Sequence, residues 1–193
     1  SSPMGSIDHP FNPLALCLGA DSTFIARTMD RDPNHLRDVL KRANEHKGTS
    51  LVEIYQNCNV FNDGAFFIYT DKETKAIETL FLEQGKPLIF GEGKNKGIKL
   101  DGFKPVIVDL TDGTSANDLW IHDEADRVKA GLLSRFFDNP KTEGHLPRPF
   151  GIFYTESRYC YEDAMADQIS TAEAKGKGDL DKLLKGGNTW TIA

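Results

Sequence analysis

The chain has 193 residues and a net charge of −6 at pH 7, with 39% hydrophobic and 27% charged residues, a mixture typical of globular proteins. The negative charge argues against a general nucleic-acid-binding protein, which would need a basic surface. Three widely spaced cysteines are an odd number, so they predict no disulfide framework and fit a reducing cytoplasm. No apolar run reaches the roughly 18 residues that would span a bilayer, so we expect no membrane association.

The first part of the chain alternates predicted helices with predicted strands. Asn12 and Asp32 each precede a proline, and a capping side chain followed by proline is a helix-start signal. A short strand is predicted at residues 23–28 after the first helix. The second helix carries an apolar stripe at three- and four-residue spacing and ends near Gly48. With the further strand that leads to Cys58, this order predicts half of a doubly wound parallel sheet.

The stretch Ser50–Asp63 leads from that strand into a turn that carries Cys58. Its apolar, β-branched and aromatic residues predict a buried strand, and the asparagines that follow predict the turn. In open α/β sheets, ligands bind outside the carboxyl ends of the strands, which is where this cysteine is placed. From position alone, a packed and unreactive thiol is the simpler interpretation of Cys58.

The pattern changes after Phe66. Residues 72–82 predict a short helix or a helix-to-strand transition, and residues 86–110 predict strands joined by turns. The glycine-rich run Gly91–Gly97 admits a phosphate-loop interpretation, but that mechanism needs a helix N-terminus directly after the glycines. Because Ile98–Leu100 reads as a returning strand, we expect an antiparallel hairpin instead.

The last third contains a predicted helix, a strand and a tail. Asp123 is the predicted cap of a helix whose apolar stripe runs from Ala125 to Phe137. His122 with its neighbouring acids admits a metal-site interpretation, although acids at a helix start are more simply explained by the helix dipole. A strand after Pro149, an amphipathic helix from about Tyr159 to Ile169 and a polar linker at 171–177 follow. Leu180–Leu184 predicts a short helix that either docks on another surface or frays.

Three runs of sequence resemble the β subunit of the 2-oxoacid:ferredoxin oxidoreductases, most closely the 2-oxoglutarate type. They are G-S-I-D-H-P-F-N-P-L-A-L at Gly5–Leu16, V-E-I-Y-Q-N-C-N-V-F-N-D-G-A-F at Val52–Phe66 and G-D-L-D-K-L-L at Gly178–Leu184. The second run is the specific one. In that family its cysteine is the last of four ligands to a [4Fe–4S] cluster, so the resemblance implies that Cys58 binds the cluster and the metal. It reverses the preference for a packed thiol.

The resemblance also implies that the chain is the C-terminal part of a longer subunit. The other three cluster cysteines and the thiamine diphosphate motif of the family lie earlier in the subunit and have no counterpart here. The implied fold class is α/β: residues 1–64 form part of a doubly wound thiamine diphosphate-binding-type sheet, and residues 65–193 form an α+β C-terminal extension. Thiamine diphosphate, Mg²⁺ and the [4Fe–4S] cluster would belong to the complete subunit, and this chain alone is expected to bind none of them.

The implied activity is oxidative decarboxylation of a 2-oxoacid to an acyl-CoA with reduction of ferredoxin. The implied partners are the α subunit of the same enzyme, ferredoxin, coenzyme A and the 2-oxoacid. The chain itself shows no paired acid and base or activated nucleophile, so no catalytic residue is predicted. A competing interpretation is a non-catalytic α/β structural or subunit-interaction module in which Cys58 is packed.

Overall fold

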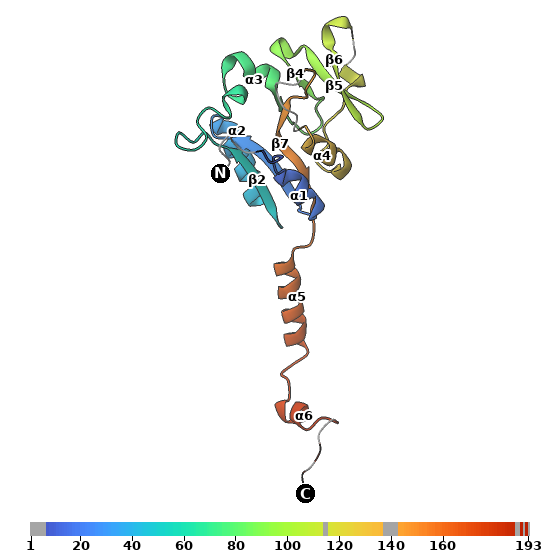
Figure 1. The fold of residues 1–193 in the computed structure, drawn as a ribbon. Coiled ribbons are helices and arrows are strands. Elements are labelled where there is room, and N and C mark those ends of the chain that lie inside the picture. The colour runs from blue at the N-terminus through green and yellow to red at the C-terminus, as the bar shows by residue number, and fades with distance from the viewer. Residues whose placement is uncertain (1–6, 114–115, 137–142, 188–189, 191, 193) are drawn as a thin grey trace. The chain divides into compact units, whose positions relative to one another are not determined.

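The computed structural model describes residues 7–113, 116–136, 143–187, 190 and 192. The chain divides into two units, Ser1–Arg158 and Tyr159–Ala193, which are described here separately. The first unit holds all seven strands of the described residues, and the second holds two helices (Figure 1).

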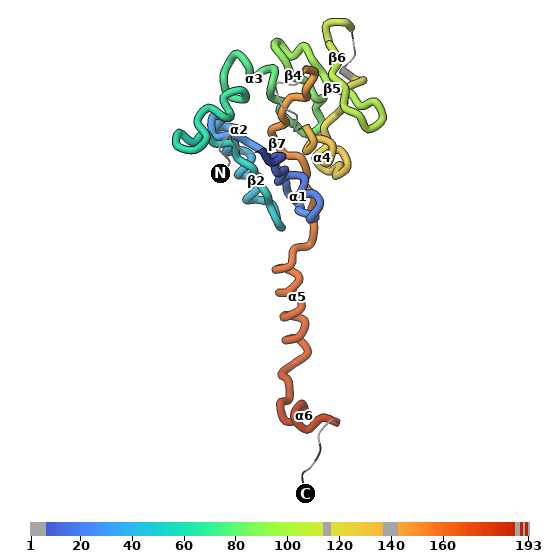
Figure 2. The backbone as a smooth tube through the Cα atoms, viewed as in Figure 1, coloured from blue at the N-terminus to red at the C-terminus, as the bar shows by residue number. Residues whose placement is uncertain are grey.

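A four-stranded mixed sheet forms the centre of the first unit, in the order β2-β1-β7-β3. Its strands are β1 (Phe24–Met29), β2 (Ser50–Tyr55), β3 (Thr79–Phe81) and β7 (Arg148–Thr155). β1 and β2 are parallel, with Phe24 opposite Ser50 and Met29 opposite Tyr55, whereas β7 runs antiparallel to β1 and parallel to β3. Figure 2 shows the late β7 segment returning to the region formed by the early part of the chain. The predicted parallel pair and the α/β class are confirmed.

Helices cover the two faces of this sheet, because successive residues of a strand point to opposite sides. Ile25 packs in a core cluster with α1 (Pro13–Gly19) and α4 (Arg127–Ser134). Its neighbours Phe24 and Ala26 instead pack with α2 (Pro33–Glu45). The Asn12 amide also donates to the Ser134 carbonyl at 2.7 Å, which ties the start of α1 to the end of α4.

The helix starts follow the cap-then-proline signals. The Asn12 side chain accepts from the Ala15 N–H at 3.1 Å, and the Asp32 side chain accepts from the His35 N–H at 3.3 Å. The predicted cap at Asp123 is wrong. Asp123 accepts from the Ala125 N–H in a turn, and the cap of α4 is Asp126, which accepts from the Lys129 N–H at 2.9 Å. Two acids three residues apart offer the same local signal, and the turn at the first one moves the helix start to the second. Phe137, the end of the predicted stripe, lies outside the described residues.

A second sheet is antiparallel, in the order β4-β5-β6, with β4 (Ile89–Phe90), β5 (Lys96–Asp101) and β6 (Lys104–Asp109). The predicted hairpin around Gly91–Gly97 is confirmed, since β4 and β5 run antiparallel. The phosphate-loop alternative is wrong, because the glycines lead into a single 3-10 turn, η2 (Glu92–Lys94), and then into β5. The helix-to-strand alternative for residues 72–82 is also confirmed: α3 (Lys72–Glu78) passes directly into β3. The remaining short 3-10 turns are η1 (Phe67–Tyr69), η3 (Leu110–Asp112) and η4 (Ala116–Asp118).

The second unit contains α5 (Tyr161–Ala174) and α6 (Leu180–Leu184), and neither helix has a buried residue. Both helices were predicted. The predicted linker at 171–177 is wrong in its first half, because α5 continues to Ala174. Residues 171–175 include no glycine or proline that would stop a helix, and Gly176 is the first glycine that does.

Two predictions about the first part of the chain concern the burial of β2 and the domain boundary at residue 64. β2 was predicted to be buried, but it is an edge strand in this chain, and only Tyr55 of its six residues is buried. The division at residue 64 stays a prediction. The strands β3 and β7, which follow that position, share one sheet with β1 and β2, which precede it.

Candidate functional site at the carboxyl ends of β1 and β2

The Cys58 loop, residues 56–64, follows β2 at the sheet edge where the parallel strands β1 and β2 both end. Asp30, the first residue after β1, joins the two strand ends. Its backbone N–H donates to the Tyr55 carbonyl at 3.0 Å, and its carboxylate accepts from the Asn57 N–H at 3.2 Å. Cys58 therefore lies where ligands bind in open α/β sheets, as the sequence predicted.

The Asn57 side chain organises the loop. Its amide nitrogen donates to Asn59 Oδ1 at 2.9 Å and to Asp63 Oδ1 at 3.0 Å, while its amide oxygen accepts from the Gly64 N–H at 2.9 Å. These three bonds use both donors and one acceptor position of the amide. Asn57 therefore stabilises the turn, as the asparagine-rich sequence predicted.

Backbone N–H groups of the loop donate to the Cys58 thiol. The N–H groups of Phe61 and Val60, and more weakly that of Asn62, hydrogen-bond to the sulfur and hold the pKa of Cys58 below its usual value. The loop closes on itself, since the Asn62 N–H also donates to the Cys58 carbonyl at 2.9 Å. The thiol is only partly buried. These donors cannot be predicted from the sequence, because backbone N–H groups leave no signal in residue types.

An aromatic cluster packs at both ends of the loop. The Tyr55 ring stacks on Phe66 with 4.4 Å between centroids and contacts Phe150 edge-on at 5.5 Å, so both ends of the loop rest on one core. Arg27, which is fully buried, lies over the Tyr55 ring at 5.3 Å and donates from Nε to Glu53 at 2.5 Å. Burial raises the pKa of Tyr55. The two ends of the loop are thus fixed by a packed core.

The tip of the loop is apolar and exposed. Val60 is 79% exposed and Phe61 is 91% exposed, directly beside the partly exposed Cys58. Exposed apolar side chains are common singly, but two adjacent ones beside a thiol with backbone donors suit a surface that contacts other polypeptide.

The other candidate metal residues are structural in the described part of the chain. His122 is buried and its Nε2 lies 2.8 Å from the Ile152 carbonyl, while its neighbour Glu124 pairs with Arg42. Among the residues that the structure describes, no three His, Cys, Asp or Glu side chains come together as a metal site, so the His122 metal interpretation is wrong. Cys17 packs against the core.

None of the helices within the described residues has the length and apolar character to cross a bilayer.

Known proteins resemble this chain in sequence. The chain is 38% identical over 197 residues to the 2-oxoglutarate oxidoreductase subunit KorB of Mycobacterium tuberculosis, an alignment that covers all of this chain and 51% of that protein. The chain is homologous to the β subunits of the 2-oxoacid:ferredoxin oxidoreductases. Related β subunits match over shorter stretches: that of Saccharolobus solfataricus is 33% identical over 78 residues, covering 40% of this chain and 26% of that protein. No protein-family model matches the chain.

A solved structure shares the fold of this oxidoreductase β-subunit homologue. It is the 2-oxoglutarate:ferredoxin oxidoreductase from Magnetococcus marinus with 2-oxoglutarate, coenzyme A and succinyl-CoA bound. The TM-score is 0.56 at 19% identity, over 94% of this chain and 45% of that one. The α/β fold read from the sequence is therefore shared with that enzyme. The chain spans about half the length of the relative that it matches along its whole length.

Proposed function

We propose that this chain is the C-terminal part of the β subunit of a 2-oxoacid:ferredoxin oxidoreductase, with 2-oxoglutarate as the substrate. The observation that carries the proposal is the match along the entire chain to a 2-oxoglutarate oxidoreductase subunit. The complete enzyme would oxidatively decarboxylate the 2-oxoacid, form the acyl-CoA and reduce ferredoxin, with thiamine diphosphate, Mg²⁺ and a [4Fe–4S] cluster as cofactors. Its partners would be the α subunit and ferredoxin, in the cytoplasm.

Cys58 would supply one of the four thiolates that hold the cluster. Cys58 fits that role in two respects. Its sulfur accepts backbone hydrogen bonds that favour the thiolate, and it is accessible at the edge of the sheet. The backbone N–H groups of Val60, Phe61 and Asn62 would go on donating to the ligating sulfur. A bound cluster would carry single electrons towards ferredoxin. The other three thiolates would come from the part of the subunit that precedes this chain.

The open edge of β2 and the exposed Val60 and Phe61 would then contact that preceding part. β2 ends the sheet in this chain, and an unpaired strand edge with partly exposed apolar residues is a surface that proteins cover. A doubly wound sheet that continues past β2 would bury both features and bring the other cysteines to Cys58.

The test uses the complete subunit, produced with its α subunit, as wild type and as Cys58→Ser. We expect the substitution to lower the iron content and 2-oxoglutarate-dependent ferredoxin reduction while thiamine diphosphate binding persists, because a hydroxyl is a poor substitute for a thiolate. Cys160→Ser is the matched control and should change neither. A full cluster with normal electron transfer in Cys58→Ser would contradict the ligand role.

Two further measurements separate the alternatives. The chain purified alone is expected to be colourless and to contain no stoichiometric iron, and about four irons per chain would refute its dependence on further thiolates. A complete subunit that has neither cluster nor activity would instead favour the non-catalytic structural module. Turnover of pyruvate in preference to 2-oxoglutarate would overturn only the choice of substrate.

A further inference from the structure

The backbone donors of the Cys58 loop form one continuous stretch of three residues. The N–H groups of residues 60–62 hydrogen-bond to the Cys58 sulfur. Residues 59–63 are all exposed, so burial does little to hold these donors in place. An N–H group stays directed at a sulfur only while the backbone on both sides of it is fixed. The contacts of residues 59 and 63, on either side of the donors, therefore determine whether the sulfur keeps its hydrogen bonds.

The Asn57 side chain holds both sides of that stretch. Its amide nitrogen donates to Asn59 Oδ1 at 2.9 Å, directly before the donors, and to Asp63 Oδ1 at 3.0 Å, directly after them. Its amide oxygen accepts from the Gly64 N–H at 2.9 Å. Asparagine combines two N–H donors and a carbonyl acceptor on a short stem, so one side chain can form all three bonds. The three donors to sulfur thus lie between two points that a single amide fixes.

Asn57 is itself attached to the sheet. Its backbone N–H donates to the Asp30 carboxylate at 3.2 Å, and the Asp30 N–H donates to the Tyr55 carbonyl at 3.0 Å. Tyr55 is the buried end of β2, and its ring stacks on Phe66 with 4.4 Å between centroids. Asn57 is partly buried, unlike the exposed residues 59–63. Hydrogen bonds therefore lead from the packed core through Asp30 and Asn57 to the donors.

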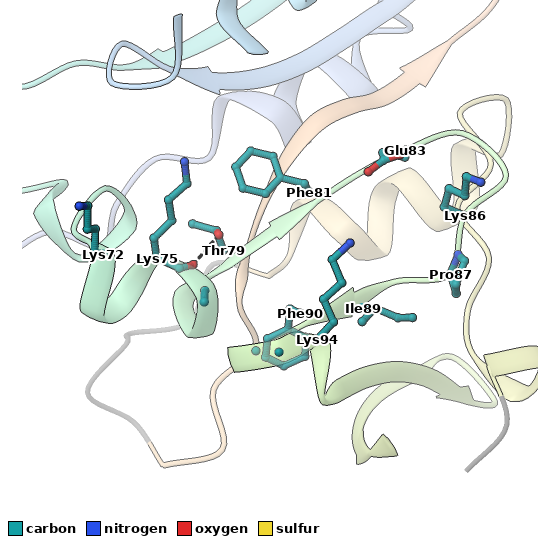
Figure 3. Close-up of a pocket in the computed structure, with 13 residues that line it drawn as sticks. Lys72, Lys75, Thr79, Phe81, Glu83, Lys86, Pro87, Ile89, Phe90 and Lys94 are labelled. Atoms are coloured by element: carbon teal, nitrogen blue, oxygen red, sulfur yellow. Dashed lines mark hydrogen bonds between the residues drawn. The ribbon is translucent and has the colours of Figure 1, made fainter. Parts of the chain in front are cut away.

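A cavity of the first unit is separate from this loop. It has a volume of about 880 Å³, and its lining residues lie between Lys72 and Lys94, on α3, β3, β4 and the η2 turn (Figure 3). Figure 3 shows Lys72 and Lys86 at opposite ends of it, so these two charges do not converge on one anionic group. Substitutions at Asn57 leave this lining unaltered, and their direct effect is confined to the loop.

Backbone donors on a ligating sulfur influence how readily a cluster is reduced. Reduction adds one electron to the cluster, and no bond forms or breaks in that step. N–H groups stabilise the more negative, reduced state more strongly than the oxidised state, so they raise the reduction potential. A loop that loses its hold on such donors should therefore have a more negative potential.

We propose that Asn57 is a positioning residue for the cluster of the complete subunit. Its side chain keeps the three backbone donors on the Cys58 sulfur and thereby sets the reduction potential of the cluster. This inference rests on the proposed role of Cys58 as a cluster ligand. Asn57 acts through the backbone of residues 60–62, so its removal should change the potential while the cluster stays bound by its thiolates.

The experiment is a redox titration of the complete subunit, produced with its α subunit and followed by the electron paramagnetic resonance signal of the reduced cluster. Dithionite supplies the electron. We expect Asn57→Ala to shift the midpoint potential by about 59 mV to a more negative value, a tenfold change for one electron and about the contribution of one hydrogen bond. Asn62→Ala is the matched control and should leave the potential unchanged. The Asn62 side chain is exposed, and alanine keeps the backbone N–H that donates to the Cys58 carbonyl.

A double variant tests the link between residues 57 and 63 itself. Asn57→Asp/Asp63→Asn exchanges the two side chains, so the amide donates from position 63 to a carboxylate at position 57. The loop keeps its charge, and the Gly64 N–H keeps an acceptor. We expect this exchange to restore the wild-type potential that Asn57→Ala loses. A shift that persists in the exchanged variant would overturn the inference.

Hydrogen exchange of this chain alone gives a measurement that needs no cluster. We expect the backbone amides of residues 60–62 to exchange at least tenfold faster in Asn57→Ala than in the wild type, as measured by nuclear magnetic resonance, and to be unaffected in Asn62→Ala. Equal rates in Asn57→Ala and the wild type would show that the amide does not hold the donors. If Asn57→Ala assembles no cluster, this measurement and the exchanged variant decide the matter.

The remaining outcomes separate this inference from the proposed function. A full cluster with an unchanged potential in Asn57→Ala, or an equal shift in Asn62→Ala, would overturn the role of Asn57 and leave Cys58 as a ligand. Failure of the proposed function has another signature, because Cys58→Ser would then keep its full cluster whatever the Asn57 variants do.

Discussion

The compact unit, Ser1–Arg158, and the tail unit, Tyr159–Ala193, each contain a helix that an aspartate caps, but the two units differ in burial. Asp126 caps α4 by accepting from the Lys129 N–H at 2.9 Å, and Asp179 caps α6 by accepting from the Lys182 N–H at 3.0 Å. α4 buries three residues, whereas α6 and the longer α5 bury none. A cap therefore specifies where a helix begins, and packing of an apolar face determines how strongly that helix is coupled to the whole fold.

The largest test of this contrast removes one large apolar side chain from each unit. Phe150 is fully buried on β7 and contacts the rings of Tyr55 and Tyr69, so Phe150→Ala should cost about 3–5 kcal/mol in the free energy of unfolding. Leu183 is 77% exposed on α6, and Leu183→Ala should stay within about 0.5 kcal/mol. Urea denaturation measures both. A comparable loss from Leu183→Ala would mean that the tail unfolds together with the compact unit.

A second pair of variants removes the two caps. Asp126→Ala should lower the free energy of unfolding of the compact unit by about 1 kcal/mol, because a helix N–H loses its acceptor. Asp179→Ala makes the same change on α6 and should reduce its helix content without moving the unfolding midpoint. Backbone chemical shifts report the first turn of each helix. Equal shifts of the midpoint by the two variants would break the contrast.

The smallest expected effect concerns pH. Burial lowers the pKa of His122, whose Nε2 contacts the Ile152 carbonyl, and burial also lowers the pKa of His35 and of His46. The unfolded chain therefore binds protons more readily, so the compact unit should lose stability as the pH falls below the ordinary histidine value of about 6.5. His122→Asn should make this decline shallower between pH 7 and 5, as measured by denaturation at each pH.

The tail unit is the internal control for that experiment. It contains no histidine, so the helix content of α5 and α6 should stay constant over the same pH range. A slope in His122→Asn as steep as that of the wild type would assign the pH dependence to the partly buried His35 and His46 instead.

Local signals in the sequence were sufficient for the starts of α1 and α2, for the parallel strands beside α2 and for the hairpin at Gly91–Gly97. Each depends on residues that are neighbours in the chain: a cap before a proline, an apolar period, or glycines at positive φ. The position of Cys58 was predictable for the same reason, since a strand followed by an asparagine-rich turn places it at a sheet edge.

Only the tertiary structure decided how distant segments meet. Nothing in its own residues places β7 between β1 and β3, because strand pairing depends on partners that are far away in the chain. The exposure of β2 follows from its edge position rather than from its apolar composition. The donors to the Cys58 sulfur are backbone groups whose direction is set by the closed loop. The sequence by itself determined the local helices, strands and turns and the position of Cys58 after a strand. Long-range packing determined which residues surround them.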